Sequence, residues 1–167
     1  MKVWYAVYTR PRFEKKAQHF LQLKGIESYL PLQRIKKKWS DRSKWVEEPL
    51  FKSYLFVHIE EKEYFETLNT YGVARFVSFN GKAAPIREQD IELLHKILDT
   101  DYKLEVVSTE LLPGAHVRIE KGPLTGYEGT LVAYAADKRV RVDVLHLEQS
   151  LLISIPLNYL SQIEEYS

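Results

Sequence analysis

The strongest constraint on the fold is a change of pattern near residue 100. Before it, apolar residues follow the two-residue spacing of strands in some segments and helical spacing in others. After residue 111 only short β-type segments remain, separated by turn residues. Residues 99–110 lie between the two patterns and combine four acidic side chains with weak periodicity. We therefore predict domains over 1–100 and 111–167, joined by a linker over 101–110.

The first domain contains four strand patterns and one basic segment. VWYAVYT (3–9), residues 26–32, FKSYLFVHI (51–59) and ARFVSFNG (74–81) are rich in β-branched and aromatic residues, which favours strands. The basic segment RIKKKWSDRSKWVEE (34–48) has a Ser-Asp pair between two flanks. It is interpreted as a projecting hairpin or a mobile loop.

Three helices are expected between these strands. The first begins at Pro11 and ends at Gly25, the second covers 61–71 and the third opens at Pro85. The apolar residues at helical spacing in the first two are Phe13, Ala17, Phe20, Leu21, Phe65, Leu68 and Tyr71. The order β-α-β-β-β-α-β-α indicates an α+β fold, a sandwich with a mainly antiparallel sheet.

Three of the seven glycines lie within eight residues of the second domain. Five short strands in this region predict a small β-barrel, whose corners are tight. Gly122 and Gly129 would supply positive φ or allow a close backbone approach there. The loop over 122–129 leaves three side chains at its rim, which are Leu124, Thr125 and Tyr127.

The charges are unevenly distributed along the chain. Residues 1–46 contain twelve Lys or Arg and three acidic residues, whereas residues 60–110 contain six and eleven. A basic end on a nearly neutral chain indicates a face for polyanions. The alternative is a solvated surface that acidic neighbours balance in the fold, and charge alone does not separate the two.

Several classes of protein are disfavoured by what the sequence lacks. Cysteine is absent, so disulfides and thiolate metal sites are excluded. The five histidines have no metal-binding spacing, and neither a phosphate-binding loop nor a nucleophile elbow occurs. No apolar run approaches the roughly 20 residues of a membrane span. We expect a monomeric cytoplasmic protein that is not an enzyme, needs no metal or cofactor and binds no membrane.

Four motifs resemble a known family. PGAHVRIEKGPLTGYEGTLVAY (113–134) resembles the KOW motif of small SH3-like barrels. WYAVYTRPRFEKKA (4–17), EPLFKSYLFVHI (48–59) and GVARFVSFNGKAAPI (72–86) resemble the N-terminal domain of the NusG family of transcription elongation and antitermination factors. The resemblance implies a NusG-type α/β sandwich followed by a KOW β-barrel.

The resemblance also implies a partner for the first domain. Factors of this family bind the clamp helices of RNA polymerase through an apolar patch and suppress pausing or termination. At the matching positions the patch comprises Tyr8, Phe51, Tyr54, Phe56 and Phe79. Tyr54 and Phe56 share one strand face, opposite Leu55 and Val57, so one pair can fill the core while the other meets a partner. Alternatively, the domain's own helices cover both faces.

The resemblance also implies a ligand for the basic residues. In the family, the edge at the start of the first helix faces the non-template DNA strand of the transcription bubble. Cations beside Trp39 and Trp45 suit single-stranded nucleic acid, whose bases stack on rings, unless these tryptophans pack back onto the domain. The expected nucleic-acid residues are Arg10, Arg12, Lys15, Lys16, Lys36, Lys37, Lys38, Trp39, Arg42 and Lys44.

The second domain departs from the general factors of the family. By resemblance its loop residues Leu124, Thr125 and Tyr127 would bind the termination factor Rho or a ribosomal protein. Leu124 stands where many relatives carry phenylalanine, and HLEQSLLISIPLNYL (146–160) lacks a segment typical of them. These departures favour a specialised, operon-directed paralogue. Two alternatives remain, a C-terminal helical hairpin in place of the barrel, and a ribosome-associated KOW protein that binds RNA.

Overall fold

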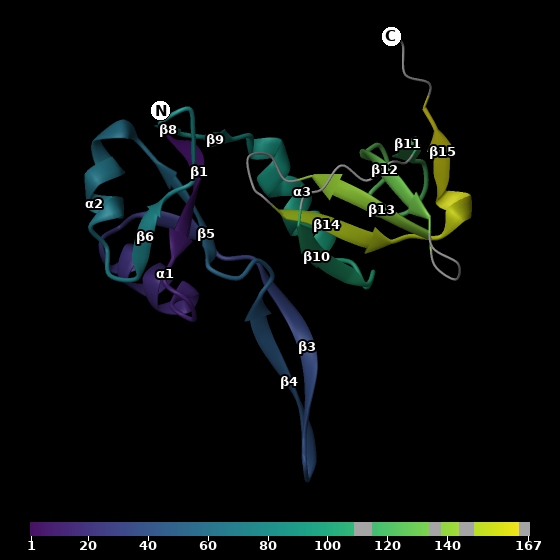
Figure 1. Ribbon diagram of the computed structural model, residues 1–167, viewed down its shortest axis with the longest axis horizontal. Coiled ribbons are helices and arrows are strands. Elements are labelled where there is room, and N and C mark those ends of the chain that lie inside the picture. The colour runs from purple at the N-terminus through teal and green to yellow at the C-terminus, as the bar shows by residue number, and fades with distance from the viewer. Residues whose placement is uncertain (109–114, 134–137, 144–148, 164–167) are drawn as a thin grey trace. The chain divides into compact units, whose positions relative to one another are not determined.

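The computed structural model separates into two compact units, Met1–Ile91 (unit 1) and Glu92–Ser167 (unit 2) (Figure 1). The residues that the structure describes are 1–108, 115–133, 138–143 and 149–163. The elements of unit 1 are β1 (Val3–Thr9), α1 (Glu14–Leu23), β2 (Glu27–Tyr29), β3 (Leu32–Trp39), β4 (Arg42–Pro49), β5 (Tyr54–Ile59), η1 (Glu61–Glu63), α2 (Tyr64–Leu68), β6 (Val73–Phe76), β7 (Ser78–Phe79), β8 (Lys82–Ala83) and β9 (Pro85–Ile86). Helix α3 (Glu88–Leu98) crosses the division between the units.

An antiparallel sheet forms the centre of unit 1. Its strand order is β2-β5-β1-β6, and β9 also pairs with β1. The β-branched and aromatic residues of β1 and β5 pair along six positions, from Val3 opposite Ile59 to Tyr8 opposite Tyr54. Helices α1 and α2 pack against one face. The buried cluster there comprises Val7, Ala17, Leu21, Ile26, Leu30, Leu55, Val57, Ile59, Val73 and Phe76. The α+β fold with a mainly antiparallel sheet is thereby confirmed.

The predicted helical faces were only partly correct. Ala17 and Leu21 are fully buried, as expected, but Phe20 is 37% exposed, and Phe65 and Tyr71 are 71% and 54% exposed. Helical spacing identifies residues on one stripe without showing how wide a stripe the sheet covers. The sheet instead covers Ala17 and Leu21 of α1 and Tyr64 and Leu68 of α2, and the Tyr64 ring stacks on Phe76.

The helix boundaries also needed two corrections. The first helix begins at Glu14 and not at Pro11, because Arg12 adopts φ of 67° in the turn before it. Pro85 does not open a helix but lies in β9, opposite Tyr5 of β1. A proline is tolerated in a strand that borders a sheet, where its missing N–H costs no ladder bond. The predicted stop at Gly25 is confirmed, with φ of +75°.

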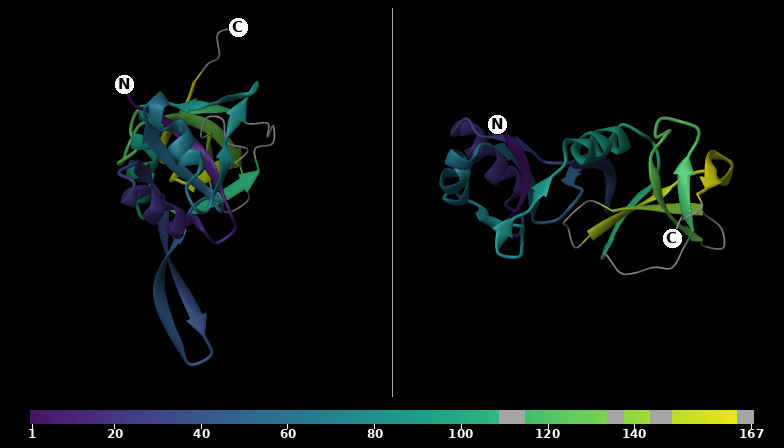
Figure 2. Two further views of the ribbon diagram at one scale, coloured as in Figure 1. Left: turned by 90° about the vertical axis from the view of Figure 1, so that its left-hand side faces the viewer. Right: turned by 90° about the horizontal axis from the view of Figure 1, so that it is seen from above.

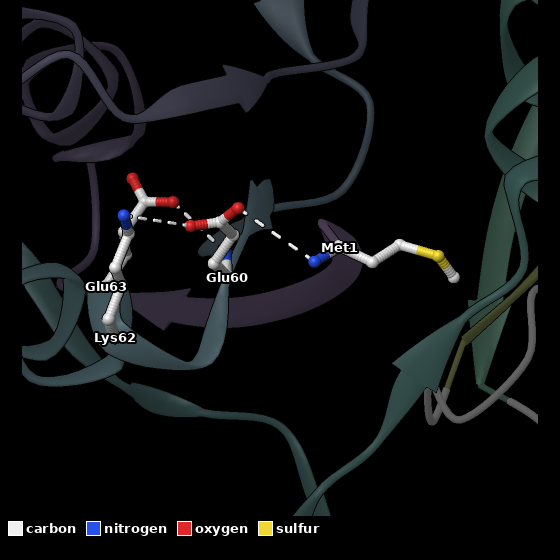
Figure 3. Close-up of polar contacts among 4 residues, drawn as sticks. All are labelled: Met1, Glu60, Lys62 and Glu63. Carbon is white, nitrogen blue, oxygen red and sulfur yellow. Dashed lines mark hydrogen bonds and ion pairs between the residues drawn. The ribbon is translucent and has the colours of Figure 1, made fainter.

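A polar cluster closes the end of β5 (Figure 3). The Glu60 backbone N–H donates to Glu63 Oε1 at 3.0 Å, which holds the turn into η1. Lys62 Nζ lies 3.2 Å from Glu60 Oε2, and the Met1 amino group lies 3.9 Å from Glu60 Oε1. The hydrogen bond and the charge of Lys62, together with the charge of the amino group, lower the pKa of Glu60. The start of β1 and the end of β5 therefore share one ionic contact.

The described residues of unit 2 form a six-stranded antiparallel sheet. Its order is β10-β14-β13-β12-β11-β15, in which β11 to β15 account for the five predicted short strands. Its elements are β10 (Leu104–Ser108), β11 (His116–Ile119), β12 (Glu128–Ala133), β13 (Lys138–Asp143), β14 (Gln149–Ser154), η2 (Leu157–Tyr159) and β15 (Leu160–Gln162). The sixth strand, β10, lies inside the segment predicted as a linker. Its backbone is instead paired with β14, which explains why Leu104, Val106 and Val107 interrupt the acidic residues there.

Two glycines of unit 2, Gly122 and Gly126, serve one turn. Gly122 has φ of +87°, and a Cβ there would lie 2.9 Å from the Tyr102 hydroxyl and 3.1 Å from the Tyr159 ring. Gly122 therefore satisfies both predicted requirements at once. Gly126, with φ of +96°, is the second residue that needs to be glycine. Gly129 lies inside β12, opposite Val117, where sequence had predicted a corner.

Candidate functional site

The most exposed element of unit 1 is the hairpin of β3 and β4, which extends away from the rest of the unit (Figures 1 and 2). Its strands pair along eight positions, from Leu32 opposite Pro49 to Trp39 opposite Arg42, around a turn at residues 40–41. They form a separate two-stranded sheet and pair with no other strand in the described parts of the chain. The predicted projecting hairpin is therefore confirmed, and the mobile-loop alternative is not.

The hairpin has two faces of similar composition. Residues that pair across a ladder point to the same side of it, and successive residues of a strand alternate. One side, the Trp45 face, carries Arg34, Lys36, Lys38 and Trp45, together with Leu32, Ser43, Glu47 and Pro49. The other side, the Trp39 face, carries Lys37, Trp39, Arg42 and Lys44, together with Gln33, Ile35, Val46 and Glu48. Trp45 and Trp39 are 53% and 48% exposed, so neither is packed back into the core as the alternative required.

Cations lie over the Trp45 ring, and Arg42 stands opposite Trp39 in the ladder. The Arg34 Cζ atom lies 5.1 Å from the Trp45 ring centroid, and Lys36 Nζ lies 6.0 Å from it. On the other face Lys37 stands directly opposite Lys44, which is an unfavourable pairing of like charges. Lys37 also forms an ion pair with Glu48 nearer the base. The Lys37–Lys44 pair therefore disfavours the isolated hairpin.

The second basic group lies around the start of α1. Arg10, Arg12, Lys15 and Lys16 are all exposed, as expected for nucleic-acid residues. The helix N-terminus itself carries Glu14, whose Oε1 accepts the Ser53 backbone N–H at 3.1 Å. The first turn of the helix is therefore already occupied by the buried carboxylate of Glu14. Any phosphate contact has to come from the four side chains.

Three of these side chains have partners within unit 1. Lys15 Nζ donates to the Glu47 carbonyl oxygen at 2.9 Å, which joins α1 to the base of the hairpin. Lys16 Nζ lies 5.0 Å from the Phe13 ring centroid, and Arg10 Cζ lies 5.7 Å from that of Tyr71. The aromatic neighbours were not predicted as site residues. Phe13 is half-buried just before α1, Tyr71 is exposed after α2, and their positions beside these cations became visible only with the fold.

The predicted polymerase-binding residues differ widely in exposure. Phe51 and Phe56 are fully buried, at 1% and 0%, and their ring centroids lie 6.3 Å apart. Tyr54 is 6% exposed, whereas Phe79 on β7 is 65% exposed. Tyr8 is half-buried. Direct partner contact by Phe51 and Phe56 is thus not supported, because their rings present no surface in this structure.

The sheet groups several aromatic rings around these positions. Tyr8 and Tyr54 pair across β1 and β5, with ring centroids 4.9 Å apart, and Arg75 Cζ lies 4.7 Å from the Tyr8 ring centroid. Tyr29 stacks on Phe56 at 6.3 Å, and burial raises the pKa of Tyr29 to about 12. Sequence reasoning missed Tyr29 and Arg75, because only strand pairing brings them beside Phe56 and Tyr8.

The three loop residues predicted in unit 2 do not share one environment. Leu124 is 1% exposed and fills the interior of the unit, so it is not at the rim. Thr125 is exposed and its hydroxyl donates to the Gly122 carbonyl at 2.6 Å. Tyr127 is half-buried, with Lys96 Nζ 5.2 Å from its ring centroid. Thr125 and Tyr127 therefore keep the exposure that a partner contact requires, and Leu124 does not.

Comparison with known proteins extends over most of the chain. The model of the family described as transcription termination factor nusG matches residues 2–95. The NusG protein of Lactococcus lactis is 26% identical over 150 residues, which covers 81% of this chain and 80% of that protein. NusG of Staphylococcus epidermidis is 26% identical over 152 residues, with 82% of each covered. Both are named transcription termination/antitermination proteins.

The fold has a counterpart among solved structures. A structure of Thermotoga maritima NusG, titled for its domain interaction, superposes with a TM-score of 0.60 at 20% sequence identity. The match covers 98% of each chain. Within the described residues, no helix is long and apolar enough to cross a membrane.

Proposed function

Because the chain belongs to the NusG family of transcription termination and antitermination proteins, we propose that it binds the clamp helices of RNA polymerase and suppresses pausing or termination. In this proposal unit 1 docks on the polymerase and contacts the non-template DNA strand of the transcription bubble. The protein acts in the cytoplasm, by binding and not by catalysis. The observation that carries the DNA contact is the exposed hairpin, which has a tryptophan and three cations on each face.

The docking surface that fits this proposal is smaller than sequence predicted. Phe79 offers an exposed ring, and Tyr8 a half-buried one. Tyr54 packs beside Tyr8 and orients it. Phe51 and Phe56 are buried in the interior, and in this proposal they do not contact the polymerase directly. Aromatic side chains of this kind supply most of the binding energy in many protein interfaces.

Replacing Phe79 by alanine tests the docking surface. We expect the affinity for purified RNA polymerase to fall at least about tenfold, because truncating an interface aromatic commonly costs more than 1 kcal/mol. The free energy of unfolding should change by no more than about 0.5 kcal/mol, because the ring is largely exposed. Phe65→Ala is the matched control, since Phe65 is equally exposed but lies on α2. Equal polymerase binding by the two variants would exclude Phe79 from the interface.

Replacing one cation on each face of the hairpin tests the DNA contact. In Lys36→Gln/Lys44→Gln, the slope of log affinity for single-stranded DNA against log salt concentration should fall by about 1.4, since each phosphate contact contributes about 0.7. Anisotropy titrations at several salt concentrations measure it. Lys2→Gln/Lys62→Gln removes the same charge from exposed sites outside the hairpin and should leave the slope unchanged. A wild-type slope near zero would contradict any phosphate contact.

For unit 2 we propose a KOW domain that recruits a second partner, a ribosomal protein or Rho. The support is the KOW-like sequence of residues 113–134 and the antiparallel strands on either side of it. Thr125 and Tyr127 are the exposed loop residues that such a partner would reach. Leu124 and the segment 146–160 depart from the general factors of the family, which favours a specialised paralogue.

A further inference from the structure

We propose that the β3–β4 hairpin binds two nucleic-acid strands at once, one on each face, so that its preferred ligand is a fork where a duplex opens into two single strands. The inference rests on the DNA contact proposed above and specifies the ligand of that contact.

Each face carries one tryptophan, three cations and one glutamate, and the two faces are separate in space. On the Trp45 face the cations are Arg34, Lys36 and Lys38. On the Trp39 face they are Lys37, Arg42 and Lys44. Each ring is about half exposed. Trp45 lies opposite Lys36, so the two tryptophans are three residue steps apart, about 10 Å along the ribbon. Because they also point to opposite sides, one nucleotide cannot stack on both.

A duplex groove would use only half of this arrangement. A two-stranded ribbon can enter the major groove, but it then presents one face to the base edges and turns the other outward. The outward tryptophan and its three cations would have no ligand. Stacking of unpaired bases on an aromatic ring next to cations uses both faces in the same way. Because a tryptophan and three cations occur on each face, two single strands are favoured over one duplex as the ligand.

A structural role does not account for the two tryptophans. An isolated two-stranded hairpin is marginally stable, and it gains most from aromatic or β-branched residues paired across the strands. The pair of this kind in the hairpin is Ile35 with Val46, whereas each tryptophan is paired with a cation, Trp45 with Lys36 and Trp39 with Arg42. Lys37 opposite Lys44 adds repulsion. A second copy of the hairpin is excluded as the occupant by the same positive charge, whereas two phosphate backbones would neutralise it.

The test compares three labelled DNA probes with the full chain by fluorescence anisotropy at constant salt. The probes are a single strand, a blunt duplex and a fork with two unpaired arms, and a fourth probe replaces one arm by RNA. Trp39→Ala, Trp45→Ala and the double variant are titrated beside Phe65→Ala, an exposed aromatic outside the hairpin. Circular dichroism confirms that each variant is folded.

The fork should bind at least tenfold more tightly than the single strand and than the blunt duplex. Each single tryptophan variant should lose about tenfold on the fork, because one arm loses its stacking platform. On the single strand each should lose no more than about twofold, because the strand can move to the other face, and only the double variant should lose tenfold. Tighter binding of the probe with an RNA arm would identify RNA as one of the two strands.

Two results would overturn the inference while leaving the DNA contact intact. One is equal affinity for the fork and the single strand, and the other is a blunt duplex that binds as tightly as the fork. Failure of all probes to bind would overturn the DNA contact itself and the inference with it. Polymerase binding through Phe79 is measured separately and is unaffected by either result.

Discussion

Phe56→Ala should lower the free energy of unfolding by about 3–5 kcal/mol, although its position in the sequence suggests a residue of a binding patch. The ring has no exposed surface, stacks on Tyr29 and meets Phe51 edge to face, and all three residues belong to unit 1. Truncation removes these contacts and leaves a cavity between β2 and β5. Urea unfolding followed by circular dichroism measures the loss as a lower midpoint with an unchanged slope.

The control for this variant is Phe65→Ala, in which a ring of the same size is removed from an exposed site. Its free energy of unfolding should stay within about 0.5 kcal/mol of the wild-type value. Polymerase binding lost in Phe56→Ala would therefore report damage to the fold. If the Phe56→Ala protein were stable but no longer bound polymerase, Phe56 would belong to the docking surface, as predicted from the sequence.

Gly72→Ala should cost about 2–5 kcal/mol, which is the second large effect. Gly72 has φ of +90°, and a Cβ there would lie 3.1 Å from the Cβ of Ala17 in α1. The cost combines about 1–2 kcal/mol for the backbone conformation with about 1–3 kcal/mol for overpacking. Thermal or urea unfolding measures the sum. Gly72 also accepts the Arg10 N–H at its carbonyl, so a shift of this turn would reach the basic residues before α1.

Two further variants separate the two causes. Gly25→Ala has a similar φ of +75° but nothing within 4 Å of the added Cβ, so it should cost only the backbone part. The double variant Gly72→Ala/Ala17→Gly removes the facing methyl group and should be less destabilised than the sum of its singles by roughly 0.5–3 kcal/mol. If Gly72→Ala and Gly25→Ala cost the same, then α1 yields to the added methyl group and the close approach is not rigid.

Much of the fold could be predicted from the sequence because strands leave a strong local pattern. VWYAVYT and FKSYLFVHI became β1 and β5, and the basic segment between them became β3 and β4. Pro85 and the linker were mispredicted for a common reason. A proline and a few acidic residues are local signals, while the pairing of β9 with β1 and of β10 with β14 depends on residues far along the chain.

The candidate site was harder to predict than the fold. The alternation of side chains along a strand predicted that Tyr54 and Phe56 share a face. It could not show that β5 is buried on both faces. The hairpin was easier, because no other described element of unit 1 pairs with it and most of its polar side chains are exposed. Sequence could place Trp39 and Trp45 on either side of the turn. Their positions on opposite faces followed only from the register of the eight pairs.

The separation of the hairpin from the five-stranded sheet has an evolutionary consequence. Because β3 and β4 pair only with each other among the described strands, residues can be added to or lost from their tips without disturbing the core. Side chains alternate, so gaining two residues in each strand would extend the reach by about 7 Å and preserve both faces. Gaining one residue in each strand would exchange the two faces. Descendants of this chain are therefore expected to vary in hairpin length by even steps per strand.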